Sequence, residues 1–191
     1  MSKIQKGDYG YLEKYKKNKL LGVLILGLMI IFIVVTVIIM LGDTKRVAIV
    51  FAILLSLPFA KTLIAYIMVA NFKPLTKSQH KEFLEDIQGE NLNILYDVVI
   101  AQYEGMKFYQ LLLVKNGRVY AYTNGKDYKS NKNDYEKWIS NAYSATKYEY
   151  KVFLTDDINA YIKKIKSISE PNDNTRIIDK HIMELILEKG V

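Results

Sequence analysis

The sequence predicts a membrane α-helical hairpin followed by an α+β cytoplasmic domain. Residues 20–70 contain two long apolar stretches separated by five residues. Residues 71–191 alternate amphipathic helical patterns with short runs of β-branched and aromatic residues. The predicted order of elements in this domain is helix, three antiparallel strands, helix, strand, helix, helix. Residues 1–19 form a basic cytoplasmic segment ahead of the hairpin.

Most of the net charge of +7 lies beside the hairpin and not in the domain. Residues 1–19 hold six Lys against two acidic residues, whereas residues 73–191 hold 18 basic and 17 acidic residues. A folded nucleic-acid binder carries a basic face, so we expect no nucleic-acid partner. A Lys beside a bilayer gains roughly 1 kcal/mol from anionic headgroups. We expect this role for Lys14, Lys16, Lys17 and Lys19.

The two apolar stretches run from Leu20 to Leu41 and from Val47 to Ala70. At about 1.5 Å per residue the first extends roughly 33 Å, which exceeds the roughly 30 Å hydrocarbon core of a bilayer. Residues 42–46 leave room only for a tight turn. Lys residues at the outer ends of both stretches outnumber the basic residues of the turn, so both termini are expected in the cytoplasm. We therefore expect a two-span protein of the cell membrane.

Lys61 is the only charged residue within the two predicted spans. A charge inside a membrane can mark an ion or proton path, but the long Lys stem can also reach the headgroups. The spans contain no Asp or Glu to pair with it, which favours the second interpretation, with Tyr66 at the membrane interface. Pro58 is expected to kink the helix and free a carbonyl group near the ammonium group.

Small residues at four-residue spacing line one face of the second span: Ala48, Ala52, Ser56 and Ala60. Such a face lets another helix approach closely. The short turn favours the first span of the same chain as the helix that packs there. The alternative is a homodimer or a larger membrane partner.

The first half of the domain is predicted as a helix followed by a meander of strands. Thr76–Ile87 is amphipathic and ends before Gly89. Strands are expected over Asn93–Tyr103, Lys107–Lys115 and Arg118–Thr123, since Asn-Gly at 116–117 is typical of a type I′ hairpin turn. This turn sets the pairs Leu113 with Tyr120, Leu111 with Tyr122, and Val114 with Val119. Both faces are apolar, so we expect helices on both sides of the sheet.

The second half alternates helices with one more strand. After a polar loop at Gly125–Asn133, helical spacing places one set of residues in the core: Tyr135, Trp138, Ile139, Ala142 and Tyr143. A strand is expected over Glu149–Leu154, and Thr155 is expected to cap a helix that begins with Asp156 and Asp157. The last helix, Thr175–Lys189, turns Ile178, Ile182 and Leu185 inward and ends at Gly190.

The sequence contains none of the common catalytic or ligand-binding motifs. The chain has no Cys, which excludes disulfides, thiolate zinc sites and cysteine nucleophiles. It has no phosphate-binding glycine loop, GxSxG elbow, HExxH or EF-hand loop. His80 and His181 are far apart in polar helical stretches, where a solvated helix face is expected. We therefore predict no catalytic, cofactor-binding or metal-ligating residue.

The order helix, three strands, helix, strand resembles the core of the PD-(D/E)xK nuclease fold. That fold needs an acid on its second strand and an acid-x-Lys on its third. Here Asp97 lies on the first predicted strand, and Glu104 and Lys107 flank a turn with two residues between them. The resemblance is one of topology alone, and it implies a domain without nuclease activity.

Short motifs spread over nearly the whole chain resemble those of a family of uncharacterised two-span membrane proteins of Gram-positive bacteria. They are Lys6, Gly7, Tyr9, Gly10 and Tyr11 before the first span, Pro58, Ala60 and Lys61 in the second, and Lys151, Val152 and Phe153 before the Asp156 helix. Some members are labelled O-linked N-acetylglucosamine transferase-like. This chain has no DxD pair or nucleotide-binding signature, so the resemblance implies the architecture and not that reaction.

Three functions are compatible with these patterns. The first is a membrane-tethered cytoplasmic interaction module, which binds a protein partner, another copy of itself or a lipid headgroup. The second is a divergent nuclease-like or hydrolase domain that uses Asp97, Glu104 and Lys107. The third is an accessory subunit of a membrane complex, held through Ala52 and Ser56. Strong core patterning without a surplus of catalytic residue types favours the first.

Overall fold

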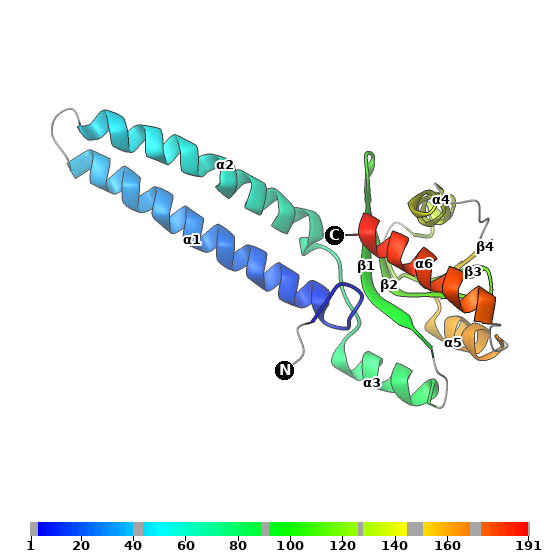
Figure 1. Ribbon diagram of the computed structural model, residues 1–191. Helices are drawn as coiled ribbons and strands as arrows, with labels where there is room; N and C mark the ends of the chain where they lie inside the picture. Colours follow the sequence, from blue (N-terminus) through cyan, green and yellow to red (C-terminus); the bar gives the residue numbers. More distant parts are fainter. Residues whose placement is uncertain are drawn as a thin grey trace. The chain divides into compact units, whose positions relative to one another are not determined.

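A computed structural model describes residues 4–39, 44–88, 92–125, 128–144, 151–168 and 173–190. The chain divides into two compact units, Glu13–Asn71 and a second unit made of Met1–Leu12 with Phe72–Val191. The elements, labelled in Figure 1, are α1 (Tyr11–Ile39), α2 (Thr44–Ala70), α3 (Lys77–Asp86), β1 (Ile94–Gln102), β2 (Gly105–Lys115), β3 (Arg118–Tyr122), α4 (Lys132–Ala142), β4 (Lys151–Thr155), α5 (Ile158–Lys166) and α6 (Asp173–Lys189).

The first unit is a hairpin of two long apolar helices, α1 and α2 (Figure 1). Both are long and apolar enough to cross a membrane, over Tyr11–Ile39 and Ile49–Ala70, and neither span is buried inside the protein. Large side chains point outward, as lipid-facing residues do, including Phe32 and Ile38, which are 72% and 73% exposed. Helix α1 begins nine residues before the predicted span because Leu, Glu and Lys in this basic stretch are good helix formers.

Two glycines of α1 let the helices of the hairpin approach each other. A Cβ atom at Gly22 would lie 3.1 Å from Cγ2 of Thr62, and one at Gly27 would lie 3.4 Å from Cε2 of Phe59. The side chain of Lys16 donates a hydrogen bond of 3.1 Å to the carbonyl oxygen of Ala70. This bond joins the outer ends of the two helices, which are the ends remote from the turn between them. Small residues at a helix contact are the common means of close packing between membrane helices.

Two of the four predicted small residues, Ala52 and Ser56, line an apolar hollow together with residues of α1. Ser56 and Ala60 are exposed and Ala52 is half-buried, while the side chain of Ala48 is outside the described residues. The half-buried residues of α2 instead follow a different stripe, which includes Leu55, Phe59, Thr62 and Tyr66. Lys61 is exposed, with Tyr66 five residues further along the helix.

We expect Gly22→Leu to separate the two helices of the hairpin, because its larger side chain has to displace Thr62. Overpacking of this kind costs roughly 1–3 kcal/mol. The chain has no Cys, so cysteines introduced at Ala65 and Lys19 report the approach of the helices through the rate of disulfide formation. The rate should fall in Gly22→Leu and stay unchanged in Leu21→Phe, where the enlarged side chain is 57% exposed in the wild type.

The domain is built on a four-stranded sheet of order β1-β2-β3-β4. The first three strands are antiparallel, and β4 pairs parallel with β3. The predicted turn is confirmed, since Asn116 and Gly117 have φ angles of 54° and 69°, as a type I′ turn requires. The predicted register is confirmed as well: Leu113 pairs with Tyr120, Leu111 with Tyr122, and Val114 with Val119.

Helices cover both faces of the sheet, as predicted. One core cluster includes Trp138 and Ile139 of α4 and Ile182 and Ile186 of α6, all packed with residues of the strands. The other includes Phe83 of α3 and three residues of α5: Tyr161, Ile162 and Ile165. The predicted inward residues of α4 are all buried. Leu185 and Ile178 of α6 are only partly buried.

The strands β1 and β2 switch faces halfway along their length. Asp97 has a φ angle of 54°, and Leu95 and Val98 on either side of it pack in the same cluster although they are three residues apart. Tyr109 and Leu112 of β2 do the same. A regular strand would place such residues on opposite faces. The left-handed conformation at Asp97 therefore accompanies a local rotation of the sheet.

Helix ends differ from the prediction by a few residues. The cap of α5 is Asp157, whose Oδ1 accepts a hydrogen bond of 2.9 Å from the amide of Asn159, so the prediction of Thr155 as the cap was wrong. Thr155 ends β4 and accepts a hydrogen bond from the amide of Asp157 instead. The predicted polar loop is shorter than expected, because α4 begins at Lys132. Gly89 and residues 149–150 are outside the described residues.

Candidate functional site

Residues 4–12, which precede the hairpin in the sequence, form part of the α/β domain, and we call them the N-terminal strap. The amide of Tyr96 in β1 donates a hydrogen bond of 2.8 Å to the carbonyl of Gly7, in an antiparallel bridge. The hydroxyl group of Tyr9 donates one of 3.1 Å to the carbonyl of Leu75. Leu12 is 2% exposed. Residues 1–19 are predicted from the sequence as one basic segment, whereas Met1–Leu12 belong to the same compact unit as Phe72–Val191.

An aromatic cluster holds the strap against α3 and β1. The ring of Tyr9 stacks on His80, with centroids 3.7 Å apart and an angle of 9° between the planes. Tyr96 meets both rings edge-on, at 5.9 Å and 5.1 Å. The predicted solvated helix face was wrong for His80, which is half-buried, whereas His181 is exposed. Partial burial lowers the pKa of His80 from its ordinary value of 6.5.

We expect this histidine to make the stability of the domain sensitive to mild acid. Because the pKa of His80 is lower in the folded state, the unfolded chain binds the proton more readily, so stability is full above about pH 6.5 and falls below it. His80→Phe keeps a ring on Tyr9 without the titration. The loss of stability between about pH 7.5 and 5.5 should be smaller in this variant, measured by the fluorescence of Trp138, the one Trp of the chain.

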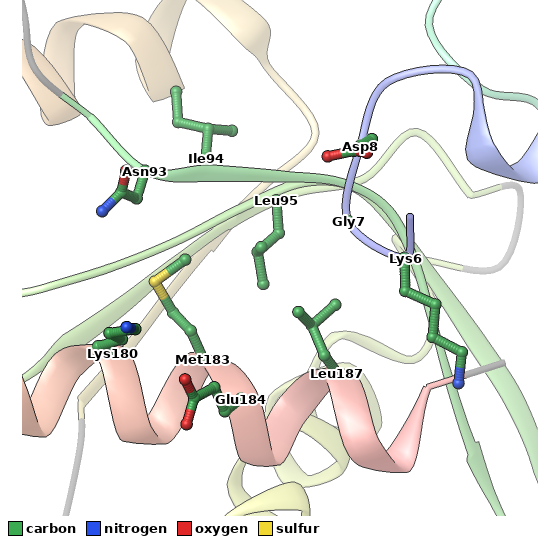
Figure 2. A pocket seen from close by; sticks show the side chains of 10 residues that line it. All are labelled: Lys6, Gly7, Asp8, Asn93, Ile94, Leu95, Lys180, Met183, Glu184 and Leu187. Carbon is green, nitrogen blue, oxygen red and sulfur yellow. The ribbon is translucent and has the colours of Figure 1, made fainter. Parts of the chain in front are cut away.

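A groove of about 320 Å³ lies between β1, α6 and the strap (Figure 2). In Figure 2, the side chain of Leu95 points toward α6, whereas that of Ile94 points to the other side of the strand. Three elements supply the wall residues: Lys6, Gly7 and Asp8 of the strap, Asn93, Ile94 and Leu95 at the start of β1, and Lys180, Met183, Glu184 and Leu187 of α6.

The groove has an apolar floor and a charged rim. Leu95, Met183 and Leu187 form the floor and belong to or pack against the core. Gly7 is required at the end of the groove, because its φ angle is 89° and a Cβ atom would lie 3.0 Å from Cδ2 of Leu95. The two strap charges serve the fold. Lys6 donates to the carbonyl of Gly190 at 3.0 Å, and Asp8 accepts from the amide of Gln5 at 2.7 Å.

The other two rim charges, Lys180 and Glu184, are exposed on α6. They lie four residues apart on one side of the helix, in the order Lys before Glu, which is the less favourable order for an ion pair within a helix. Opposite charges of equal number give this rim no net charge. The groove is therefore suited to an amphipathic ligand with an apolar group and a charged group, and not to a polyanion.

The structure does not bring together the residues of the nuclease-like alternative. Asp97 is 4% exposed, whereas Glu104 is exposed at the turn between β1 and β2. Lys107 pairs with Ile100, three residues along β1 from Asp97, or about 10 Å. Its ammonium group lies over the ring of Tyr135, 4.5 Å from the centroid. Across the described ranges, no group of three His, Cys, Asp or Glu side chains is placed to hold a metal ion.

Two further hollows lie elsewhere. One of about 260 Å³ in the domain is lined by Asn116, Arg118, Tyr120, Lys164, Ser167 and Ile168. Its polar groups are partly engaged, since the Ser167 hydroxyl donates to the carbonyl of Lys164 at 2.7 Å. The other, of about 360 Å³, is an apolar hollow within the hairpin, lined by Val34, Val37, Ile38, Ile49, Ala52, Ile53 and Ser56.

Comparisons of this chain with protein families, with curated proteins and with solved structures found no match. The resemblance to two-span proteins of Gram-positive bacteria therefore stays a prediction from short motifs.

Proposed function

We propose that this protein is a membrane-tethered interaction module of the cell membrane, with both termini and the α/β domain in the cytoplasm. Two observations support the tether: the apolar hairpin, and a domain that draws residues from both sides of it. Because Gly7 and Tyr9 contact β1 and α3, the two outer ends of the hairpin have to emerge on the same side of the bilayer. The excess of Lys at these ends favours the cytoplasmic side.

The observation that carries the function is the groove beside β1. It combines an apolar floor with exposed charges of both signs. Two of its walls, β1 and α6, are held in place by the core of the domain. Such a combination of a few polar groups around an apolar centre is typical of binding sites. The partner that we propose is a protein, bound at the membrane surface without chemical conversion.

Topology is tested with single cysteines in the cysteine-free chain. An impermeant maleimide should label Asp43→Cys in intact cells, and should label Ser78→Cys only after the cells are permeabilised. The protein should remain with membranes after alkaline extraction. Labelling of both positions from outside would contradict the proposed orientation, and release by alkali would contradict the tether.

Binding is tested with a photocrosslinking residue at position 184 in the full chain, expressed in its native membrane. We expect one discrete adduct, identified by mass spectrometry, that is lost when Lys180→Glu is added. The matched control carries the crosslinker at Lys163, an exposed position of α5 outside the groove. An adduct of twice the chain mass would identify a homodimer as the partner. The absence of any adduct specific to position 184 would contradict the binding role of the groove.

A further inference from the structure

The end of the sheet beside the turn between β2 and β3 carries a row of three cations. Lys115 of β2 pairs with Arg118 of β3, and Arg118 pairs with Lys151 of β4. Paired residues of neighbouring strands point to the same face of a sheet, and so do residues two apart in one strand. Tyr120 and Phe153, two residues further along, pack in the cluster that contains residues of α5. The three cations therefore lie on the face that α5 covers.

No carboxylate in the described part of the protein forms an ion pair with this row. Lys115 is only 6% exposed, although lysine is rarely buried unless it is paired. Like charges opposite each other on neighbouring strands also destabilise a sheet. Natural proteins accept such local costs chiefly at functional sites. The row therefore points to a negatively charged ligand.

The hollow of about 260 Å³ between β3 and α5 adjoins the row at Arg118. It shares no residue with the groove beside β1, and five of its six wall residues carry a polar side-chain group. Lys164 supplies a fourth cation from α5, with its ammonium group 5.9 Å from the centroid of the Phe153 ring. The C-terminal end of a helix disfavours an anion, but three Lys residues in the last turn of α5 offset this partial charge.

Tyr120 gives the hollow a neutral hydrogen-bond donor. It lines the hollow and is 3% exposed. Burial raises the pKa of its hydroxyl group, with an opposing effect from Arg118 and a further rise from Asp179. The hydroxyl group therefore keeps its proton at neutral pH. The carboxylate of Asp179 accepts hydrogen bonds from the amides of Asn116 and Gly117, so this one acid serves the turn while four cations surround the hollow.

We propose that this hollow binds a phosphate monoester. Such a group carries about −1.5 to −2 charges at pH 7, which would offset the repulsion within the row. The planar guanidinium group of Arg118 suits two phosphate oxygens, and Lys164 acts as a point charge. The volume is suited to a phosphate with a small organic group, carried either by a soluble compound or by a lipid headgroup. This site is independent of the protein partner proposed for the groove.

The first probe is glycerol 3-phosphate, titrated by calorimetry into the full chain in uncharged detergent micelles at fixed salt. Binding should saturate at one molecule per chain, and glycerol should not bind. The affinity should fall below about pH 6, where the monoester gains a proton. Phosphatidic acid, a lipid with the same phosphate group, is then added to the micelles. Competition with glycerol 3-phosphate would identify a lipid as a possible source of the ligand, whereas no competition would restrict the site to soluble phosphates.

Two neighbouring lysines of α5 provide a matched pair of variants. Lys164 lines the hollow, whereas Lys163 is exposed and does not line it. Lys164→Gln should weaken the binding of glycerol 3-phosphate roughly tenfold, the effect of about one charge-assisted contact. Lys163→Gln removes the same charge and should change the affinity less than about twofold, because exposed charges are screened by salt. Arg118→Gln should weaken binding at least as much as Lys164→Gln.

Lys151→Glu separates a ligand site from a structural role. It places an opposite charge beside Arg118 and removes the repulsion between the two strands. The ligand-free domain should therefore unfold at a higher denaturant concentration than the wild type, followed by the fluorescence of Trp138. The affinity for glycerol 3-phosphate should fall by roughly tenfold or more. A residue that served the fold alone would not raise stability when it is replaced.

Two results would overturn the inference. One is the absence of saturable binding of both glycerol 3-phosphate and phosphatidic acid to the folded wild type. The other is an equal loss of affinity in Lys163→Gln and Lys164→Gln, because this would show a diffuse attraction of anions to α5 and no defined site. Neither result bears on the groove, whose partner is tested separately by crosslinking from position 184.

Discussion

Tyr9→Ala is expected to destabilise the α/β domain by about 3 kcal/mol, although Tyr9 precedes the hairpin and the sheet follows it. The substitution removes a stacked contact with His80, an edge contact with Tyr96 and the hydrogen bond to Leu75. Aromatic pairs contribute about 0.5–1.5 kcal/mol each and a hydrogen bond about 1 kcal/mol.

The measurement is denaturant unfolding of the full chain in detergent, followed by the fluorescence of Trp138, which lies in α4 on the other face of the sheet. Tyr9→Phe is the matched control, because it keeps both ring contacts and loses only the hydroxyl group. It should cost about 1 kcal/mol. Equal stability of wild type and Tyr9→Ala would show that the strap adds nothing to the domain.

A second large effect is expected at Asp179 of α6, which holds the turn between β2 and β3. Its carboxylate is 5% exposed and accepts hydrogen bonds from the amides of Asn116, at 2.8 Å, and Gly117, at 3.4 Å. Asp179→Ala leaves both amides without this acceptor. Hydrogen bonds to charged groups contribute about 1.5–3 kcal/mol, so we expect a loss of about 3 kcal/mol.

Asp179→Asn is the control for this prediction, because it keeps one oxygen acceptor without the charge. Its loss should be about half that of Asp179→Ala. Both are measured by the same unfolding experiment. Hydrogen exchange of the amides of Asn116 and Gly117 locates the effect, since these two should exchange faster in Asp179→Ala. A uniform change across the domain without faster exchange at the turn would argue against the proposed contact.

Much of the fold is predictable from the sequence because its signals are local. Asn116 and Gly117 permit positive φ angles, which fixes a two-residue turn and with it the register of β2 and β3. The spacing of Tyr135, Trp138 and Ile139 determines the buried face of α4. The length and apolar composition of the two stretches, with only five residues between them, predict the hairpin of α1 and α2.

The groove was not predictable in the same way because its walls come from three distant segments. The sequence suggests that Lys6 and Asp8 are charges beside a membrane, whereas in the structure they line a groove together with residues of β1 and α6. The signal that could have found the strap is Gly7 with Tyr9, a turn residue and an aromatic residue in a segment otherwise rich in Lys. The face switch at Asp97 was also not predicted. The apolar residues of β1 are nearly continuous, so the sequence does not show which residues point to which face of the sheet.

The strap has a consequence for how this protein is made. Residues 4–12 are synthesised first, yet their contacts at Leu75, His80 and Tyr96 become available only after the entire hairpin has left the ribosome. If just one of the two helices crossed the bilayer, the strap and β1 would end on opposite sides of it. The sheet would then lack the chain that pairs at Tyr96, and the core around Leu12 would stay open. In the proposed two-span topology, folding of the domain would therefore depend on the insertion of both helices.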